Sequence, residues 1–364
     1  MRITDVAITL FAWEAGPHTL LPGAGEHPRS GDLGLIEIRT DEGVTGLSFL
    51  GALDHPASTD APGVARWLKP LLVGADPLAR ERLFKAMWAQ VRHVGIRSVG
   101  AVDVALWDLA GKAAGLPIHQ LLGTAREAVP VYVSSQRFAE PEAYAAQAAE
   151  VFAASWAGYK VHPPKFSVAG DIAVARAVRD AVGDRTLFFD GGWAYTAFTA
   201  YQIGLALQEL GYFWYEDPLG PDDVAGYVRL AKQLTIPLIA TEQPGGSLAS
   251  YQPWLLQHAT HALRGDVPTR GGITGMVKGA RLAEAFGLNY ELHYSGTALG
   301  DAANVQVAMA IGNGEFLETP LPDPIHRYAT DFDWHIDAAG RTPAPTKPGL
   351  GVEVDRELIA RKRI

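Results

Sequence analysis

The fold of this chain is decided by three apolar runs that each end on a carboxylate: Leu187-Phe188-Phe189-Asp190, Phe213-Trp214-Tyr215-Glu216 and Pro237-Leu238-Ile239-Ala240-Thr241-Glu242. The carboxylates are 26 positions apart in both intervals (216 − 190 and 242 − 216), which suits one strand, loop, helix and return loop. Short apolar runs bounded by turn residues are typical of parallel strands covered by helices on both faces. In a closed barrel, Asp190, Glu216 and Glu242 would converge at the C-terminal rim. Because converging carboxylates repel one another, the pattern predicts a hard divalent cation, Mg²⁺ for preference.

The rest of the chain extends this pattern to eight strand-like runs. They cover residues 129–134, 159–162, 187–190, 213–216, 238–242, 262–266, 290–293 and 316–318. Their ends lie 24 to 28 positions apart, with alanine-rich helical segments between most of them. Strands that alternate with helices imply right-handed crossovers, and eight of them predict a barrel over residues 126–320.

The first third of the chain has a different pattern. Residues 2–11 and the hairpin of residues 35–48, which turns at Asp41-Glu42-Gly43, predict an antiparallel meander, and residues 65–122 have helical spacing. Residues 14–32 and 52–62 are expected to be loops that select the substrate. We therefore expect an α+β domain over residues 1–125, to which a proline-rich tail, residues 321–364, returns.

Composition limits the class of protein. Hydrophobic residues make up 48% and charged residues 20% of the 364 residues, which is ordinary for a globular chain that folds throughout. The formal net charge of −9 argues against nucleic acid or an anionic membrane as a partner. The chain has no cysteine, which excludes disulfides and thiolate chemistry. Met1 begins a strand pattern rather than a signal peptide, and no apolar run is long enough to span a bilayer, so the cytoplasm is the expected location.

Every run from the second onward ends on ionisable residues: Lys160 with His162, Asp190, Glu216, Glu242, Asp266, His293 and Glu318. Buried barrel strands favour apolar residues, so such a series indicates a functional rim rather than solvated charges. Lys160 and His162 are two positions apart on one strand and therefore point to the same side. A neighbouring cation would depress the pKa of either and bring it closer to that of a useful base.

These motifs resemble the mandelate racemase subgroup of the enolase superfamily. The resemblance extends over nearly the whole chain, including Gly271-Gly272-Ile273-Thr274 and the tail Pro348-Gly349-Leu350-Gly351-Val352. It implies an α/β fold, a modified (β/α)7β TIM barrel with an α+β capping domain, and it implies a homo-oligomer. The roles that it implies are Mg²⁺ ligands for Asp190, Glu216 and Glu242, a His-Asp dyad for His293 and Asp266, the Lys-x-Lys motif for Lys160 and His162, and an acid at the last strand for Glu318.

The chemistry implied by this resemblance is removal of the proton α to a carboxylate. Such a proton is weakly acidic, so its removal needs a base and a cation that stabilises the enediolate. We expect dehydration of an acid sugar, an aldonate or aldarate, to a 2-keto-3-deoxy acid. Racemisation, epimerisation and cycloisomerisation use the same chemistry, and a barrel that only binds a sugar acid is a third possibility.

Two assignments stay open on the sequence alone. His162 replaces the second lysine of the motif, and can be a base, a substrate contact or a structural histidine. Lys160 and Glu318 can act in catalysis or form a salt bridge across the barrel mouth.

Overall fold

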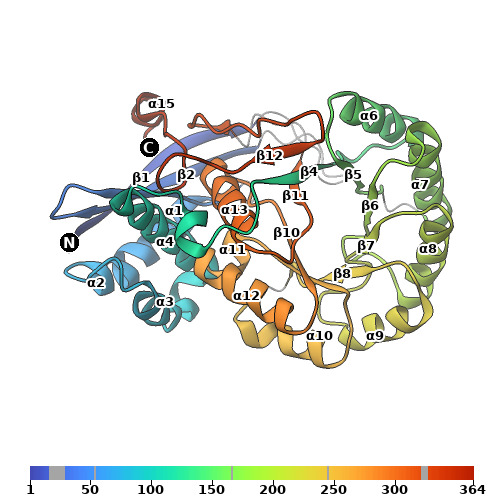
Figure 1. Ribbon diagram of the computed structural model, residues 1–364, viewed down its shortest axis with the longest axis horizontal. Coiled ribbons are helices and arrows are strands. Elements are labelled where there is room, and N and C mark those ends of the chain that lie inside the picture. The colour runs from blue at the N-terminus through green and yellow to red at the C-terminus, as the bar shows by residue number, and fades with distance from the viewer. Residues whose placement is uncertain (16–28, 53–54, 165–166, 244–245, 321–326) are drawn as a thin grey trace.

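The computed structural model describes residues 1–15, 29–52, 55–164, 167–243, 246–320 and 327–364 (Figure 1). A three-stranded antiparallel sheet in the order β1-β2-β3 lies beside a near-closed parallel barrel. Its strands are β1 (Ile3–Ala15), β2 (Arg29–Thr40) and β3 (Thr45–Leu50). The predicted hairpin between β2 and β3 is confirmed, and Gly43 (φ +79°) supplies the left-handed residue that its turn requires.

Both predicted loops of this region are shorter than expected. β1 and β2 remain paired as far as Ala15 and Arg29, because the extension buries Trp13 and Leu33. The second loop ends at helix α1 (Ala57–Gly63), where the side chain of Asp32 accepts hydrogen bonds from the backbone N–H (2.6 Å) and hydroxyl (2.7 Å) of Ser58. Residues 16–28 and 53–54 of these two predicted loops lie outside the described residues.

The helical part of the first third packs against this sheet. After α1 it comprises η1 (Val64–Leu68), α2 (Lys69–Leu72), α3 (Arg80–Trp88), α4 (Val91–Ala114) and α5 (Ile118–Leu122). The small residues of α4 allow the close packing that the sequence predicts. At Gly46 of β3, a Cβ atom would lie 2.0 Å from the carbonyl oxygen of Ala105, so only glycine fits there.

The predicted eight-stranded barrel is confirmed. Its parallel strands are β4 (Ala128–Ser134), β5 (Gly158–Val161), β6 (Leu187–Asp190), β7 (Trp214–Glu216), β8 (Leu238–Ala240), β9 (Ala262–Gly265), β10 (Asn289–Leu292) and β11 (Leu317–Pro320). They are ordered β10-β9-β8-β7-β6-β5-β4-β11. The crossovers contain α6 (Pro141–Ala153), α7 (Val168–Val182), α8 (Ala197–Glu209), α9 (Val224–Gln233), η2 (Leu248–Tyr251) with α10 (Gln252–Leu256), α11 (Val267–Arg270) with α12 (Ile273–Ala285), and α13 (Ala298–Ala310). This is the (β/α)7β arrangement.

An aromatic cluster fills the lower part of the barrel and fixes what lies above it. Tyr132, Phe188 and Trp214 are fully buried there, with the rings of Phe188 and Trp214 4.0 Å apart between centroids. Side chains two positions apart on a strand share a face. Asp190 and Glu216 therefore point into the barrel one layer above these rings.

The described part of the tail, residues 327–364, runs back along the molecule. β12 (Arg341–Pro343) pairs antiparallel with β4, and α15 (Arg356–Arg361) precedes a C-terminal residue, Ile364, whose N–H donates to Leu10 of β1 (3.1 Å). The tail thus contacts both the barrel and the sheet, and the division into 1–125 with 321–364 and 126–320 stays a proposal. Within the described ranges, none of the helices combines the length and hydropathy that a membrane span requires.

Candidate active site

The three carboxylates that the sequence singles out lie together at the C-terminal rim. One oxygen each of Asp190, Glu216 and Glu242 lies within 4.8 Å of the others. Asp190 and Glu216 end β6 and β7 in register with one another and are buried. Glu242, half-buried, lies two residues beyond the end of β8. The predicted convergence of these three residues therefore holds, although Glu242 belongs to a loop rather than to the predicted strand.

The position of Glu242 depends on a strained residue before it. Thr241 has φ +85°, which a β-branched residue rarely adopts. Two hydrogen bonds to the backbone of Arg264 hold it: the Arg264 N–H donates to Oγ1 (2.8 Å), and Oγ1 donates to the carbonyl (3.2 Å). Such strain persists only where the surroundings fix it, which is common at functional sites.

Lys160 lies below the rim, 1% exposed. Its Nζ lies 2.7 Å from Glu318, 3.1 Å from Glu216 and 3.3 Å from Asp190. Burial disfavours the ammonium form, but the carboxylates of Glu216 and Glu318 outweigh it and hold the pKa of Lys160 well above its usual value. The ion pair between Lys160 and Glu318, which the sequence left as an alternative to catalysis, is therefore formed.

His162 lies above Lys160, one residue past the end of β5, and its side chain is 19% exposed. Its Nε2 is 3.1 Å from Oδ2 of Asp190. Burial lowers the pKa of His162, and the carboxylate of Asp190 opposes this shift. The backbone N–H of His162 donates to the hydroxyl of Ser135 (2.8 Å), which fixes the chain at this point.

His293 and Asp266 form the predicted dyad. Nδ1 of His293 lies 2.6 Å from Oδ2 of Asp266, and Nε2 lies 3.5 Å from Glu242. Burial disfavours the imidazolium, but Glu242 and Asp266 outweigh it and raise the pKa of His293 to about 9. Burial also acts against ionised Asp266, whose pKa is nevertheless lowered by its hydrogen bonds from His293 and Thr269. Since Asp266 begins α11 and accepts from the N–H of Thr269 (2.7 Å), its orientation is fixed by the helix.

Glu318 of β11 connects the cations below the rim. It contacts Lys160 with one oxygen and Arg264 with the other, and the hydroxyl of Ser134 donates to it. Burial raises the pKa of Glu318, but Lys160 and Arg264 outweigh this effect and hold the pKa well below its usual value. Glu318 is thus an ionised carboxylate that positions two buried cations.

Sequence reasoning missed Arg264. This residue of β9 is fully buried, with Nε 2.7 Å from Glu216 and 3.7 Å from Glu242, and its guanidinium donates to the hydroxyl of Tyr132 (3.0 Å). A signal for it was present, because an arginine two positions before Asp266 in an apolar strand must face the barrel interior.

The charges of this region fit a divalent cation. Its carboxylates are Asp190, Glu216, Glu242, Asp266 and Glu318, and its cationic side chains are Lys160, Arg264 and His293. Five carboxylates and three cations leave a formal charge of 3 − 5 = −2. Burial raises the pKa of Glu216 to about 7, and the carboxylates of Asp190 and Glu318 add to this shift, although Arg264 and Lys160 oppose it. An all-oxygen triad with a surplus of two negative charges suits Mg²⁺.

Comparisons with known proteins agree with this arrangement. The curated relatives include the arabinonate dehydratase of Saccharolobus solfataricus, 28% identical over 92% of this chain and 91% of the relative, and the D-galactarolactone cycloisomerase of Agrobacterium fabrum, 28% identical over 91% of each. Among solved structures, D-glucarate dehydratase from Agrobacterium tumefaciens complexed with magnesium has a TM-score of 0.90 and 30% identity, covering 100% of this chain and 99% of that one.

Two family matches cover most of the chain. Residues 5–123 match the mandelate racemase / muconate lactonizing enzyme N-terminal domain, and residues 143–358 match the enolase C-terminal domain-like family. With these two matches and the similarity to D-glucarate dehydratase, the chain belongs to the enolase superfamily, in its mandelate racemase and muconate lactonizing enzyme branch.

Proposed function

We propose that this protein is a Mg²⁺-dependent lyase that dehydrates an acid sugar to a 2-keto-3-deoxy acid. The observation that carries this proposal is the placement of two imidazoles at opposite ends of the triad. His162 contacts Asp190 at one end, and His293 contacts Glu242 at the other. A substrate carboxylate between them would have one imidazole on each side.

In this proposal Asp190, Glu216 and Glu242 would hold Mg²⁺, which would supply stabilisation of the negative charge that develops on the substrate carboxylate. His162 accepts the proton from the α-carbon, and the C–H electron pair forms a double bond to the β-carbon. The β-hydroxyl leaves as water with a proton from His293, and the resulting enol tautomerises to the 2-keto acid. Asp266 holds the tautomer of His293 and stabilises its protonated form.

We assign the base to His162 rather than Lys160 because of their exposure. The side chain of His162 is 19% exposed at the rim, whereas that of Lys160 is 1% exposed and surrounded by three carboxylates. Lys160 is therefore proposed as the buried cation that holds the carboxylates in position. Glu318 is in turn proposed to hold Lys160 in position through their ion pair.

The resemblance to dehydratases supports this reaction, and the similarity to the cycloisomerase keeps an isomerase as the alternative. In a racemase, epimerase or cycloisomerase the same pair of imidazoles would move a proton without loss of water. A barrel that only binds a sugar acid is disfavoured by the complete set of acid–base groups. We further propose that the protein acts in the cytoplasm as a homo-oligomer, on a small carboxylate rather than on nucleic acid or a membrane.

The test is incubation with a panel of aldonates and aldarates in D₂O, with and without Mg²⁺. We expect a 2-keto product that requires Mg²⁺, and its loss in His162→Asn and His293→Asn. His258→Asn is the matched control, because His258 is exposed and its φ of +54° suits asparagine. Deuterium at C2 with inverted configuration and no keto product would instead indicate an epimerase.

A further inference from the structure

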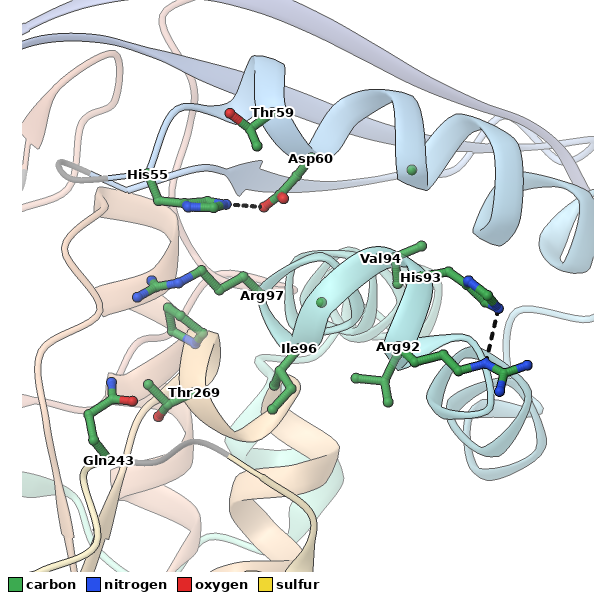
Figure 2. Close-up of a pocket in the computed structure, with 14 residues that line it drawn as sticks. His55, Thr59, Asp60, Arg92, His93, Val94, Ile96, Arg97, Gln243 and Thr269 are labelled. Atoms are coloured by element: carbon green, nitrogen blue, oxygen red, sulfur yellow. Dashed lines mark hydrogen bonds and ion pairs between the residues drawn. The ribbon is translucent and has the colours of Figure 1, made fainter. Parts of the chain in front are cut away.

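A cavity of about 570 Å³ lies between the capping helices and the barrel (Figure 2). Its walls come from α1, from the first turns of α4, and from the barrel segments after β8 and β9. The cavity is within the size range of small-molecule sites. It is also lined mainly by polar and charged groups, which distinguishes it from a packing defect between two apolar surfaces.

This cavity shares a wall with the candidate active site. Gln243, which lines it, directly follows Glu242 of the triad. Thr269, which also lines it, donates its hydroxyl (2.6 Å) and its N–H (2.7 Å) to Asp266, the partner of His293. The cavity is therefore bounded by residues that adjoin both the triad and the dyad.

One cation in the cavity has no partner of its own. Arg97 makes no hydrogen bond or ion pair with any residue in the described part of the chain, although it is half-buried. The other charged side chains are paired: His55 lies 3.0 Å from Asp60, and Arg92 donates to His93 (3.1 Å). In Figure 2, Arg97 extends from α4 toward the side of His55, whereas Arg92 and His93 lie on the opposite side of that helix.

A break in α4 accompanies this placement. Gly95 has φ +75° and ψ 161°, which is not helical, and the helix resumes after it. A residue with a side chain would be strained in this conformation. Arg97 thus begins the continuing part of the helix, on the edge of the cavity and next to the barrel.

We propose that this cavity binds a second carboxylate at the distal end of the substrate, so that the acid sugar is a dicarboxylate, an aldarate. The unpaired guanidinium of Arg97 presents a planar set of donors that matches a carboxylate with two hydrogen bonds. The amide of Gln243 and the hydroxyl of Thr269 also line this cavity. They are polar groups of the kind that the distal hydroxyls of such a substrate would contact. This inference rests on the proposed function, because it assumes that the proximal carboxylate reacts at the triad.

The test compares matched pairs of substrates, galactarate with galactonate and glucarate with gluconate, by kcat/KM. The parent protein should prefer the diacid of each pair. Arg97→Met should lower kcat/KM for the diacids by about 10- to 100-fold, the usual effect of losing a charge-assisted pair of hydrogen bonds, and change the monoacids by less than about threefold. Arg281→Met removes the same charge from an exposed position on α12, outside the cavity, and should leave both substrate classes unchanged.

Binding to the Mg²⁺-loaded protein, measured by calorimetry, separates this inference from the proposed function. If no acid sugar yields a keto product but galactarate binds more weakly to Arg97→Met than to the parent, the dehydratase proposal fails and the diacid site stands. The diacid site would be overturned if Arg97→Met weakened the binding of galactarate and galactonate equally. It would also be overturned if the parent protein bound the monoacids more tightly than the diacids. A preference for 6-phosphogluconate over glucarate that depends on Arg97 would also overturn it, since the distal group would then be a phosphate.

Discussion

Replacing Arg264 by methionine tests how the buried charges of the barrel are balanced. Arg264 lies 2.7 Å from Glu216 and 3.7 Å from Glu242 and also pairs with Glu318. Methionine keeps much of the volume but removes the charge, so the formal charge of the region falls from −2 to −3. Leaving carboxylates buried without their partner is strongly destabilising, by about 3–5 kcal/mol.

This loss converts to a measurable shift in melting temperature. At about 2.1 cal/mol/K per residue, the 364 residues give an unfolding entropy of about 0.8 kcal/mol/K. A loss of 3–5 kcal/mol therefore lowers the Tm by about 4–7 °C in a buffer containing EDTA. The assay is thermal unfolding followed by circular dichroism, with the parent protein measured in parallel.

Mg²⁺ should partly reverse the effect, because the two cations act on the same carboxylates. Without Arg264, the negative charge of Glu216 and Glu242 is less neutralised and attracts Mg²⁺ more strongly. We expect the Kd for Mg²⁺ to fall about tenfold, which is about 1.4 kcal/mol of binding free energy. Since a ligand of the folded state stabilises it according to its affinity, saturating Mg²⁺ should narrow the gap in unfolding free energy by that amount. Calorimetric titration with Mg²⁺ alone gives the affinity without any measurement of activity.

Two controls isolate the charge. Arg264→Lys keeps it and should lose less stability than Arg264→Met. Arg281→Met removes an arginine from an exposed pair with Glu284 (3.1 Å) and should change stability by less than about 0.5 kcal/mol. The reasoning is refuted if Arg264→Met melts with the parent in EDTA and binds Mg²⁺ with the same affinity.

Two further predictions concern the contacts between the capping segments and the rest of the chain. Burial raises the pKa of Asp103 to about 7, although the N–H and hydroxyl of Thr274 donate to its carboxylate. The folded state therefore binds more protons than the unfolded state between about pH 4 and pH 7. The stabilisation that protonated Asp103 contributes is complete below about pH 4 and is lost as the pH rises through 7. Denaturant titrations should show the unfolding free energy of Asp103→Asn, relative to the parent, rising by up to about 4 kcal/mol from pH 4 to pH 8, and parallel pH profiles would contradict this. Asp108 accepts hydrogen bonds from the N–H groups of Leu47 (2.8 Å) and Leu350 (2.9 Å) and forms an ion pair with Lys112 (2.6 Å). Asp108→Ala should therefore lower the free energy of unfolding by about 3–5 kcal/mol and increase hydrogen exchange at the Leu350 amide. Unchanged exchange at Leu350 would show that other contacts hold the tail.

Much of the barrel is predictable from the sequence because its constraints are local and repeated. An apolar run followed by a carboxylate marks both a strand and its functional end, so Asp190 and Glu216 follow directly from period-two alternation above a buried aromatic layer. Glu242 shows where this reasoning stops. Its strand ends at Ala240, and its position depends on a left-handed Thr241 held by Arg264, an interaction between two strands that no local pattern encodes.

The predicted loops were the least accurate part for a related reason. A segment rich in glycine, proline and histidine is typical of a loop, but burial of Trp13 and Leu33 extends the two strands into it. Likewise Asp32 and Ser58 determine where α1 begins, although they are 26 positions apart. Contacts of this kind depend on which elements meet in space, and propensity within either segment alone does not contain that information.

The buried cations explain how the five carboxylates of this region can share one barrel before any ligand binds. Lys160 and Arg264 each bridge Glu216 and Glu318, so both of these central carboxylates have cationic partners in the folded protein. Because these cations occupy the lower side of the triad, we propose that a metal and a substrate carboxylate bind at the upper side, between His162 and His293. The same arrangement limits metal affinity, since each positive charge that stabilises the free protein repels the incoming ion. The buried cations that hold these carboxylates together without Mg²⁺ must therefore make Mg²⁺ bind less tightly than it would to the bare triad.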